Sequence, residues 1–477
     1  MTTFILAIVL LIGGYMIYSK VVERLFGIND NEPTPAYTKG DNLDYIPMPW
    51  WKGSLIQLLN IAGLGPIFGA VMGALYGPVA FIWIVVGSIF AGAVHDYFSG
   101  MLSLRHRGEQ YPQLVRRYLG NGAAIFIYGI TIVLMILVAS SFTAGPAQLI
   151  AQITPLSFLA AIGIVFAYFL LAALLPVNKI IGKIYPVFGG ILIFMAVAVG
   201  VALLFTDRQI PNLTVENLHP QELPIWPLLM VTISCGAISG FHSTQSPIIA
   251  RTLKKESDGR KVFYGAMIAE GIIAMIWAAA GMTFFGGTEG LQAALAEGGP
   301  AGVVNEISIT FLGTLGGILA ILGVIILPIT TGDTALRSSR MMLTEVIGKK
   351  YTKINGKVGV FLMTFVMAVP VLILSTIQFE FLWRYVGWTN QVVATFMLWT
   401  AAVYLLHKNR AHLVCAIPAI FMSAVVCTYI FYAPEGFGMD YQVSVIIGLV
   451  LTAIIAFWYI NKVKKVKRGQ QTNVDAA

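Results

Sequence analysis

Apolar runs long enough to cross a lipid bilayer recur along the whole chain, and this feature limits the fold more than any other. A membrane helix needs about 20 mainly apolar residues to span a hydrocarbon core of roughly 30 Å. Of the 477 residues, 57% are hydrophobic and 11% are charged, whereas a soluble domain carries about 25% charged residues. We therefore expect an all-α polytopic membrane protein. The composition excludes a soluble Rossmann or TIM-barrel enzyme, a secreted disulfide scaffold and a disordered regulator.

The apolar windows predict about thirteen transmembrane helices. The first window has no basic start and no small-X-small cleavage motif, so we interpret it as a retained anchor and not as a signal peptide. The windows lie near residues 3–19, 55–72, 79–99, 122–143, 155–176, 184–205, 225–247, 260–285, 309–334, 357–376, 381–406, 411–432 and 441–461.

The distribution of basic residues supports these windows and predicts the orientation of the chain. Cytoplasmic loops of membrane proteins collect Lys and Arg. If the N-terminus lies outside and the C-terminus in the cytoplasm, 28 of the 30 basic residues fall in cytoplasmic segments. The net charge of +8 then needs no nucleic-acid partner.

The second and seventh windows contain residues that a spanning helix ordinarily avoids. Glycine and proline weaken helical order, and unwound backbone at membrane depth is tolerated where it lines a cavity. We therefore expect these windows to bind the substrate, with simple kinks in packed helices as the alternative. The candidate substrate-binding residues are Asn60, Gly63 and Gly65 in the second window and Gly236, Ser239, Gly240, His242, Ser243 and Gln245 in the seventh.

The two interrupted windows lie five helices apart, so they enter the membrane from opposite sides. This spacing predicts two inverted five-helix repeats, and substrates of such proteins bind where the broken helices meet. The expected units are 1–54 (anchor helix and cytoplasmic loop), 55–224 (first repeat), 225–410 (second repeat) and 411–477 (two additional helices and a basic cytoplasmic tail).

Glu270 is the clearest candidate for proton coupling. A charge at the bilayer centre costs at least about 2.5 kcal/mol, and Glu270 follows Lys261 by nine residues, or about 13 Å of helix. That distance puts it near the midplane, where desolvation favours a protonated carboxyl. A neutral Glu270 that only packs between helices is the alternative.

Two further groups of polar residues are candidates for the transport cycle. Thr330, Thr331 and Asp333 offer the hard oxygen ligands that suit a small cation or a proton. A salt bridge from Asp333 to Arg337, four residues on, is the alternative. His95 and Asp96, near the inner end of the third window, are candidate gate residues, with packing as the alternative.

The sequence offers no support for catalysis. It contains no Walker loop, no His-X-X-Glu-His pair and no Cys/His metal cluster, and the adjacent His242 and Ser243 have no third group to complete a catalytic triad. We therefore expect no enzyme activity, no cofactor and no metal beyond a coupling sodium ion.

Several segments resemble the carbon starvation protein A family of bacterial inner-membrane transporters. They run from about residue 55 to 406, and the most specific is Cys-Gly-Ala-Ile-Ser-Gly-Phe-His at 235–242. His95 stands where the family pattern has Gln, and the chain is shorter than the better-known members. The other matching segments begin at Gly63, Phe90, Tyr264, Thr331 and Trp388.

The resemblance implies both a fold and an activity. The family is similar to the amino acid, polyamine and organocation superfamily, whose five-plus-five inverted repeat is of the leucine-transporter type. The resemblance also implies uptake of peptides or pyruvate, linked to the stress response of carbon starvation.

These observations predict a secondary active importer in the bacterial inner membrane that works by alternating access. It would take up peptides or a small carboxylate such as pyruvate together with a proton or a sodium ion. Its partners would be the solute, the coupling ion and the lipid bilayer. The alternative is a membrane sensor or channel-like receptor that binds solute without accumulating it.

Overall fold

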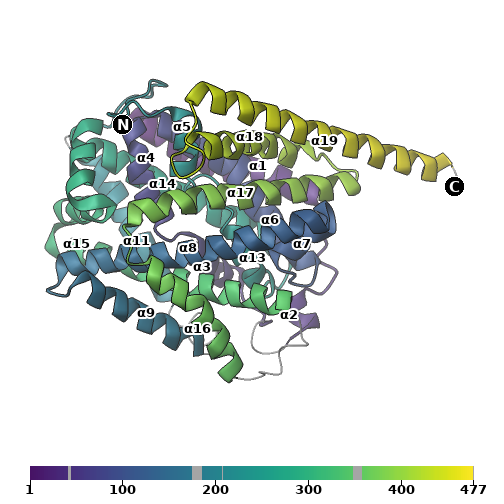
Figure 1. The fold of residues 1–477 in the computed structure, drawn as a ribbon, viewed down its shortest axis with the longest axis horizontal. Coiled ribbons are helices and arrows are strands. Elements are labelled where there is room, and N and C mark those ends of the chain that lie inside the picture. Colours follow the sequence, from purple (N-terminus) through teal and green to yellow (C-terminus); the bar gives the residue numbers. More distant parts are fainter. Residues whose placement is uncertain (41–44, 175–184, 207, 348–356, 476–477) are drawn as a thin grey trace.

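The computed structural model describes residues 1–40, 45–174, 185–206, 208–347 and 357–475. These residues form helices and connecting loops and contain no β-strand. Many of the helices lie side by side with their axes in a common direction (Figure 1). The expectation of an all-α fold is confirmed.

The first half of the chain supplies a peripheral helix, a broken helix and a set of longer helices. Its elements are α1 (Thr2–Phe26), α2 (Pro35–Thr38), α3 (Trp50–Ile61), η1 (Gly65–Gly69), α4 (Ala70–Gly73), η2 (Ala74–Tyr76), α5 (Val79–Val86), η3 (Gly87–Gly92), α6 (Ala93–Arg105), α7 (Tyr111–Leu119), α8 (Asn121–Ile153), α9 (Phe158–Leu174) and α11 (Tyr185–Leu204).

The second half begins with another broken helix. Its elements are α12 (Ile225–Thr232), α13 (His242–Ala250), η4 (Glu256–Asp258), η5 (Arg260–Tyr264), α14 (Gly265–Phe284), α15 (Thr288–Ile347), α16 (Lys357–Leu374), α17 (Phe379–His407), α18 (Leu413–Tyr432) and α19 (Tyr441–Asp475).

Every predicted window contains helix, but not every window is a span by length and composition. Among the described residues, nine helices are long and apolar enough to cross a membrane, and the bent pair Trp50–Ile61 with Gly65–Tyr76 raises the number to as many as ten. The apolar segments Phe158–Phe169 and Leu362–Leu374 are shorter. The number of thirteen crossings therefore stays a prediction.

The long element α15 is divided internally by two glycines. Gly299 and Gly313 have φ angles of 63° and 67°, in the left-handed region that glycine adopts without a steric penalty. The chain turns at both positions, and only Gly316–Leu343 qualifies as a membrane span. This span overlaps the predicted window at 309–334.

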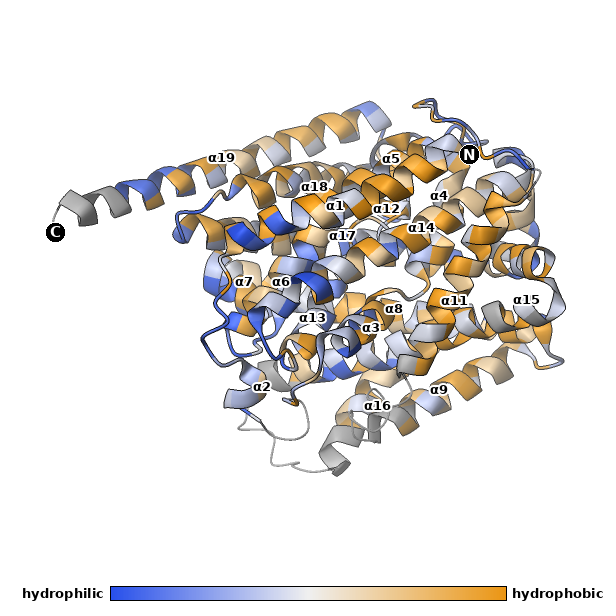
Figure 2. Cartoon of the chain, turned by 180° about the vertical axis from the view of Figure 1, so that it is seen from behind, coloured by the Kyte–Doolittle hydropathy of each residue, from blue (hydrophilic) through white to orange (hydrophobic). Residues whose placement is uncertain are grey.

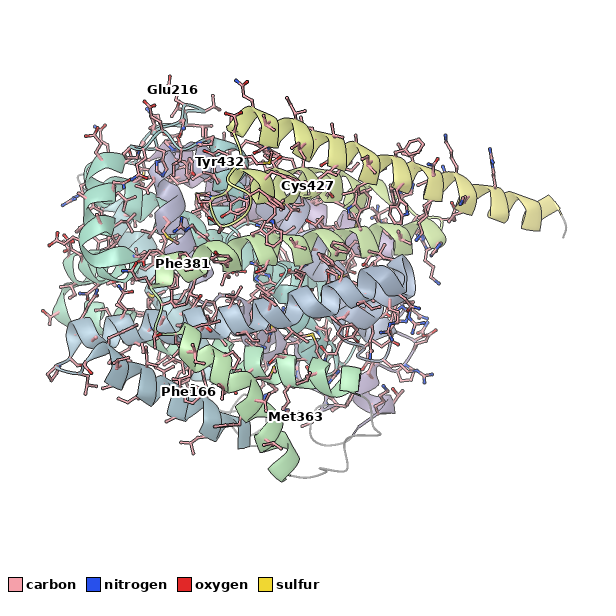
Figure 3. All side chains as sticks on the ribbon, in the orientation of Figure 1. Phe166, Glu216, Met363, Phe381, Cys427 and Tyr432 are labelled. Atoms are coloured by element: carbon pink, nitrogen blue, oxygen red, sulfur yellow. The ribbon has the colours of Figure 1, made fainter. Side chains whose placement is uncertain are left out.

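Burial separates peripheral helices from central ones. In the apolar windows of α1 and α19, 22% of the residues are buried, compared with 94% in α17. Hydrophobic residues predominate in the outer helices, and hydrophilic residues gather at the end of the bundle that holds α2 and α7 (Figure 2). Phe166 and Met363 lie on α9 and α16 at one edge of the molecule (Figure 3). This arrangement is typical of a protein that exposes its sides to lipid.

Candidate functional site

The chain leaves helical geometry at residues 62–64, and the helical segments on either side are bent by 60°. Pro66 follows at the second position of η1 and has no amide hydrogen to donate. A Cβ added to Gly63 would lie 2.4 Å from Cε2 of Phe142. Glycine therefore allows the close approach of the Phe142 ring, and the expected interruption of the second window is present.

The seventh window is also interrupted, because α12 ends at Thr232 and α13 begins only at His242. Asn390 of α17 holds the segment between them. Its Oδ1 accepts hydrogen bonds from the backbone N–H of Phe241 at 2.6 Å and from the hydroxyl of Ser239 at 3.2 Å. Asn390 is fully buried, so its bond to the Phe241 N–H satisfies a backbone donor of the unwound segment.

The two breaks lie against each other. A Cβ added to Gly65 would lie 2.2 Å from Cβ of Cys235. A Cβ added to Gly73 would lie 2.2 Å from Cγ1 of Ile233. Both contacts are too short for any side chain, so the glycines of the first broken helix allow the second to pack directly against it.

Three buried amides lie next to this junction. The fully buried side chain of Asn60 has no hydrogen-bond partner for either Oδ1 or Nδ2 among the described residues. Gln57 donates to Ser246 over 3.4 Å, and in the part of the chain that the structure describes the Oε1 atoms of Gln57 and Gln245 are unpaired. Buried polar groups normally have partners. Asn60 therefore offers both a donor and an acceptor for a polar solute, whereas Gln57 and Gln245 offer their oxygens as acceptors, because their Nε2 atoms already donate within the protein.

Four other predicted substrate-binding residues maintain the second break itself. Gly236 packs on Ala274, and Gly240 packs on the backbone carbonyl of Asn390, at 2.5 Å and 2.3 Å from an added Cβ. Ser239 is bonded to Asn390 at 3.2 Å, and the Ser243 hydroxyl donates to the Gly240 carbonyl at 2.6 Å. In this conformation they shape the site.

The first amides of α13 are already occupied. The backbone N–H groups of His242, Ser243 and Thr244 donate to the carbonyl oxygens of residues 239, 240 and 241 at 3.3, 3.0 and 2.9 Å. A free helix N-terminus attracts anions, but these three donors are satisfied within the protein. Any attraction of an anion to this site must therefore come from other groups.

A chain of four ionisable side chains lies beside the second break. Asp96 joins two imidazoles, because its Oδ1 lies 2.8 Å from Nδ1 of His95 and its Oδ2 lies 2.8 Å from Nδ1 of His242. On its other side, Nε2 of His242 lies 3.3 Å from Oε2 of Glu270. All four side chains are fully buried. The structure thus unites the two predicted gate residues with the candidate proton-coupling residue.

The candidate ion ligands do not converge in this conformation. The Thr331 hydroxyl lies 3.1 Å from the carbonyl oxygen of Leu59, at the broken end of α3, whereas the Thr330 hydroxyl donates to the Leu327 carbonyl at 2.7 Å. Asp333 lies 3.8 Å from the guanidinium of Arg337. The alternative for Asp333, a salt bridge to Arg337, is therefore present as a long ion pair. Of the candidate ion ligands, Thr331 is the one that contacts a broken helix.

A cavity of about 870 Å³ opens at the basic end of the molecule, and neither break contributes to its lining. Its most heavily bonded residue is Arg105, whose guanidinium donates to both carboxylate oxygens of Glu256 at 2.9 Å and to the Tyr404 hydroxyl at 2.6 Å. These bonds tie α6, η4 and α17 together at this end. We assign the cavity no part in solute binding at the breaks.

Sequence reasoning missed two residues of the site. Asn390 was not among the candidate residues, because an amide in a membrane helix often only joins two helices, yet it anchors the second break. Gln57 was not selected, although it lies three residues before Asn60 and so shares its helix face. The three-residue spacing between Gln57 and Asn60 could have identified Gln57 from the sequence. The partner of Asn390 was not readable, since it lies about 150 residues away along the chain.

The family of the chain is shown by a match along most of its length. A family model described as carbon starvation protein CstA matches residues 1–165, 142–296 and 278–429. The chain belongs to this family. It is 44% identical over 352 residues to an uncharacterized membrane protein of Haemophilus influenzae, covering 62% of this chain and 95% of that protein.

Two relatives that are named as transporters are more distant. The peptide transporter CstA of Bacillus subtilis is 28% identical over 58% of this chain and 58% of its own length. The pyruvate/proton symporter BtsT of Escherichia coli is 24% identical over 55% of this chain and 46% of its own length. This chain thus spans about half the length of the named transporters that it matches.

A solved structure shares the fold. The manganese transporter of Eremococcus coleocola, in the form of a histidine-to-alanine mutant, superposes with a TM-score of 0.51 at 11% sequence identity, covering 89% of this chain and 99% of that one. At this identity the likeness concerns the fold alone. The apolar helices and the CstA-family relatives identify the chain as a multi-pass membrane protein.

Proposed function

We propose that this chain is a secondary active transporter that imports peptides or a small carboxylate such as pyruvate by alternating access. The observation that carries the proposal is the junction of two broken helices with buried, unpaired amides beside it. In transporters built from inverted repeats, substrates bind between such breaks. The names of the relatives, a peptide transporter and a pyruvate/proton symporter, supply the two solute classes.

The substrate would contact Asn60 and Gln245, with Gln57 added to the expected set. The unpaired Nδ2 of Asn60 would donate to a carboxylate or to a peptide carbonyl, and the unpaired amide oxygens of all three side chains would accept from a peptide N–H. Because the unpaired groups lie where α3 and α13 approach each other, a solute there would be held by both broken helices. Movement of one against the other would then open the site to one side of the membrane at a time.

Coupling would use two different sets of groups. Glu270 would take the proton, since it is fully buried and lies 3.3 Å from the imidazole of His242. For sodium, the Leu59 carbonyl and the Thr331 hydroxyl would supply hard oxygen ligands, and Thr330 and Asp333 would need to turn towards them. His95 and Asp96 would act with Glu270 and not as a separate gate.

The architecture behind this mechanism is also part of the proposal. Residues 55–224 and 225–410 would form the two inverted repeats, 1–54 the N-terminal anchor and loop, and 411–477 the additional helices and the cytoplasmic tail. The protein would lie in a bacterial inner membrane with its N-terminus outside. The proposed repeats are supported by the fact that both interrupted windows are broken and that the two breaks are in contact.

Reconstitution tests the proposal directly. The purified chain in proteoliposomes should concentrate labelled pyruvate or a dipeptide inside the vesicle when a proton or sodium gradient is imposed, and should stop when the gradient is collapsed. Empty vesicles provide the control. If either solute binds but does not accumulate under any gradient, the transporter proposal is wrong, and the alternative of a membrane sensor or channel-like receptor takes its place.

A further inference from the structure

We propose that the cavity of about 870 Å³ at the basic end of the molecule is a regulatory site for a small, water-soluble phosphate ester. The bound ester would hold the ends of α6 and α17 together and so slow transport. The binding site lies apart from the breaks and goes beyond the proposed function, whereas the effect on transport rests on it.

The lining of the cavity has an excess of positive charge. It contains four Lys or Arg side chains but two carboxylates. Glu256 is already neutralised, because both of its oxygens accept hydrogen bonds from Arg105 at 2.9 Å. Burial lowers the pKa of His106, so this imidazole adds no charge at neutral pH. The remaining cations of the lining are exposed and have no acidic partner among the described residues; they are Lys39, Arg107 and Lys408.

The polar groups of the lining are mainly hydrogen-bond donors. Lys39 gives one N–H to the Arg107 carbonyl at 3.0 Å and keeps two for a ligand. The Tyr404 hydroxyl accepts from Arg105 at 2.6 Å, and its own hydrogen has no acceptor among the described residues. The other carboxylate, that of Glu32, is exposed and accepts a hydrogen bond from its own segment. A ligand that is rich in acceptor oxygens fits this lining.

The three cations without acidic partners stand on different parts of the chain. Lys39 follows α2, Arg107 follows the end of α6, and Lys408 follows the end of α17. A phosphate group has about 1.5 to 2 negative charges at pH 7 and three acceptor oxygens on one centre, so it can contact cations from three directions at once. A carboxylate has one charge and two oxygens. The lining therefore favours a phosphate group over a carboxylate.

The size and polarity of the cavity favour a soluble ester over a lipid headgroup. Its volume lies in the range of small-molecule sites, about 300–1,000 Å³. Among the described lining residues, only Pro33, Pro35 and Leu104 have aliphatic side chains, and hydrophilic residues gather at this end of the bundle (Figure 2). A phospholipid would also need apolar surface for its acyl chains next to the headgroup.

The cavity lies where helices from both halves of the chain meet. Arg105 of α6 already joins η4 and α17 through Glu256 and Tyr404. A phosphate between Arg107 and Lys408, which both line the cavity, would add a second bridge between the same helix ends. In the proposed architecture α6 and α17 belong to different repeats, and alternating access moves one repeat against the other. An ester that binds the joined ends better than the separated ends shifts the population towards this conformation.

Calorimetric titration of the full chain in phosphatidylcholine nanodiscs tests the site, with glycerol 3-phosphate as the probe. Glycerate has a carboxylate in place of the phosphate, and glycerol has no charge. We expect glycerol 3-phosphate to bind at one site, glycerate to bind at least about tenfold more weakly, and glycerol to give no binding heat.

Nanodiscs that also contain phosphatidylglycerol separate the two sources of a phosphate group. We expect glycerol 3-phosphate to bind in both kinds of nanodisc. Binding that is lost when phosphatidylglycerol is present would assign the cavity to a lipid headgroup and overturn the soluble ligand.

Variants of exposed cations separate the cavity from the general surface charge. Arg107→Gln and Lys408→Gln should each weaken glycerol 3-phosphate binding about threefold, and together about tenfold, with unchanged thermal unfolding. Two controls leave the cavity intact and should bind as the wild type. Lys254→Gln removes an exposed cation in the loop after α13, and Glu216→Gln removes an exposed carboxyl in the loop before α12.

Uptake by proteoliposomes tests the effect on transport. Glycerol 3-phosphate is supplied on both faces, so that both orientations of the protein meet it. Saturating ester should slow uptake of pyruvate or dipeptide at least about fivefold. The double variant should transport normally without the ester and lose the inhibition.

Each outcome decides the inference. Absence of glycerol 3-phosphate binding, equally tight binding of glycerate, or unchanged binding by the double variant overturns it. Binding that has no effect on uptake overturns the regulatory role. If the ester binds while neither solute is transported, the proposed function falls and the binding site stands.

Discussion

His242 connects the two parts of the site at the scale of single residues. Its backbone begins α13, next to the break, and its side chain links Asp96 at 2.8 Å with Glu270 at 3.3 Å. The sequence grouped it with the substrate-binding residues because it lies in the interrupted window. Because the side chain lies between two carboxyl groups, we propose that His242 also takes part in proton handling.

Replacing Glu270 with Gln should separate exchange from accumulation. The amide keeps the size of the side chain but cannot release a proton, so gradient-driven uptake should fall to the level of empty vesicles while exchange of internal for external solute continues. Both rates are measured in the same proteoliposomes. The Glu216→Gln protein should retain both activities. Normal accumulation by Glu270→Gln would remove Glu270 from the coupling mechanism.

Replacing Asn390 with Ala should destabilise the second break. The change removes the acceptor of the Phe241 N–H at 2.6 Å and leaves that buried donor unpaired, which costs about 1–3 kcal/mol. Thermal unfolding in detergent measures the loss. Asn121→Ala, at the exposed start of α8, is the matched control and should unfold like the wild type. Equal stability of both variants would show that Asn390 does not support the break.

At the scale of elements, the broken helices combine a local and a long-range requirement. Glycine and proline weaken each helix locally, as at Pro66. The glycines also provide room for the partner helix, since Gly65 meets Cys235 and Gly73 meets Ile233. The same residue type therefore creates the break and allows the two breaks to touch.

Replacing Gly65 with Ala should separate the two breaks and abolish transport. The added Cβ would lie 2.2 Å from Cβ of Cys235 and 2.4 Å from its sulfur. A second change, Cys235→Gly, removes both atoms and should restore part of the uptake. Cys235→Ala keeps the Cβ and should not restore it.

Gly129→Ala provides the control for this series. Gly129 lies on α8 with no atom within 4 Å of an added Cβ, so the substitution should leave uptake in proteoliposomes unchanged. Full activity of Gly65→Ala would show that the close packing of the breaks is not required for transport.

At the scale of the whole molecule, the N-terminus and the C-terminal part of α19 lie at opposite ends of the bundle (Figure 2). Polar residues concentrate at the end that holds α2 and α7, and the C-terminal part of α19 extends beyond the bundle on that side (Figures 1 and 2). The loop with Glu216 lies at the edge of the molecule near the N-terminus (Figures 1 and 3). In the proposed orientation, the end that holds α2 and α7 lies in the cytoplasm, and the loop with Glu216 lies outside.

Cysteine labelling should confirm that orientation. A cysteine introduced at exposed Glu216 should react with a membrane-impermeant maleimide in intact cells, whereas one at exposed Lys254, in the loop after α13, should react only after the membrane is opened. The native Cys235 and Cys415 are buried and Cys427 is half-buried, so labelling of the unmodified protein is measured in parallel and subtracted as the background. Equal labelling of both positions in intact cells would contradict the assigned orientation.

The fold class, the approximate places of the helices and the two interruptions were all readable from the amino-acid sequence. These features depend on local properties. An apolar run of sufficient length forms a helix in lipid because its backbone groups must be satisfied within the segment, and glycine or proline interrupts that helix wherever it occurs. The family segments, such as Cys-Gly-Ala-Ile-Ser-Gly-Phe-His at 235–242, were equally readable without coordinates.

Which polar groups meet, in contrast, depends on how the helices pack. Asp96 and His242 are 146 residues apart in the chain, and Phe241 and Asn390 are 149 apart. Residue spacing along one helix predicts which side chains share a face, but it contains no information on which helices become neighbours. The partners of a buried charge are set by that packing, because a charge in the low-dielectric interior must find its counterpart across helix boundaries.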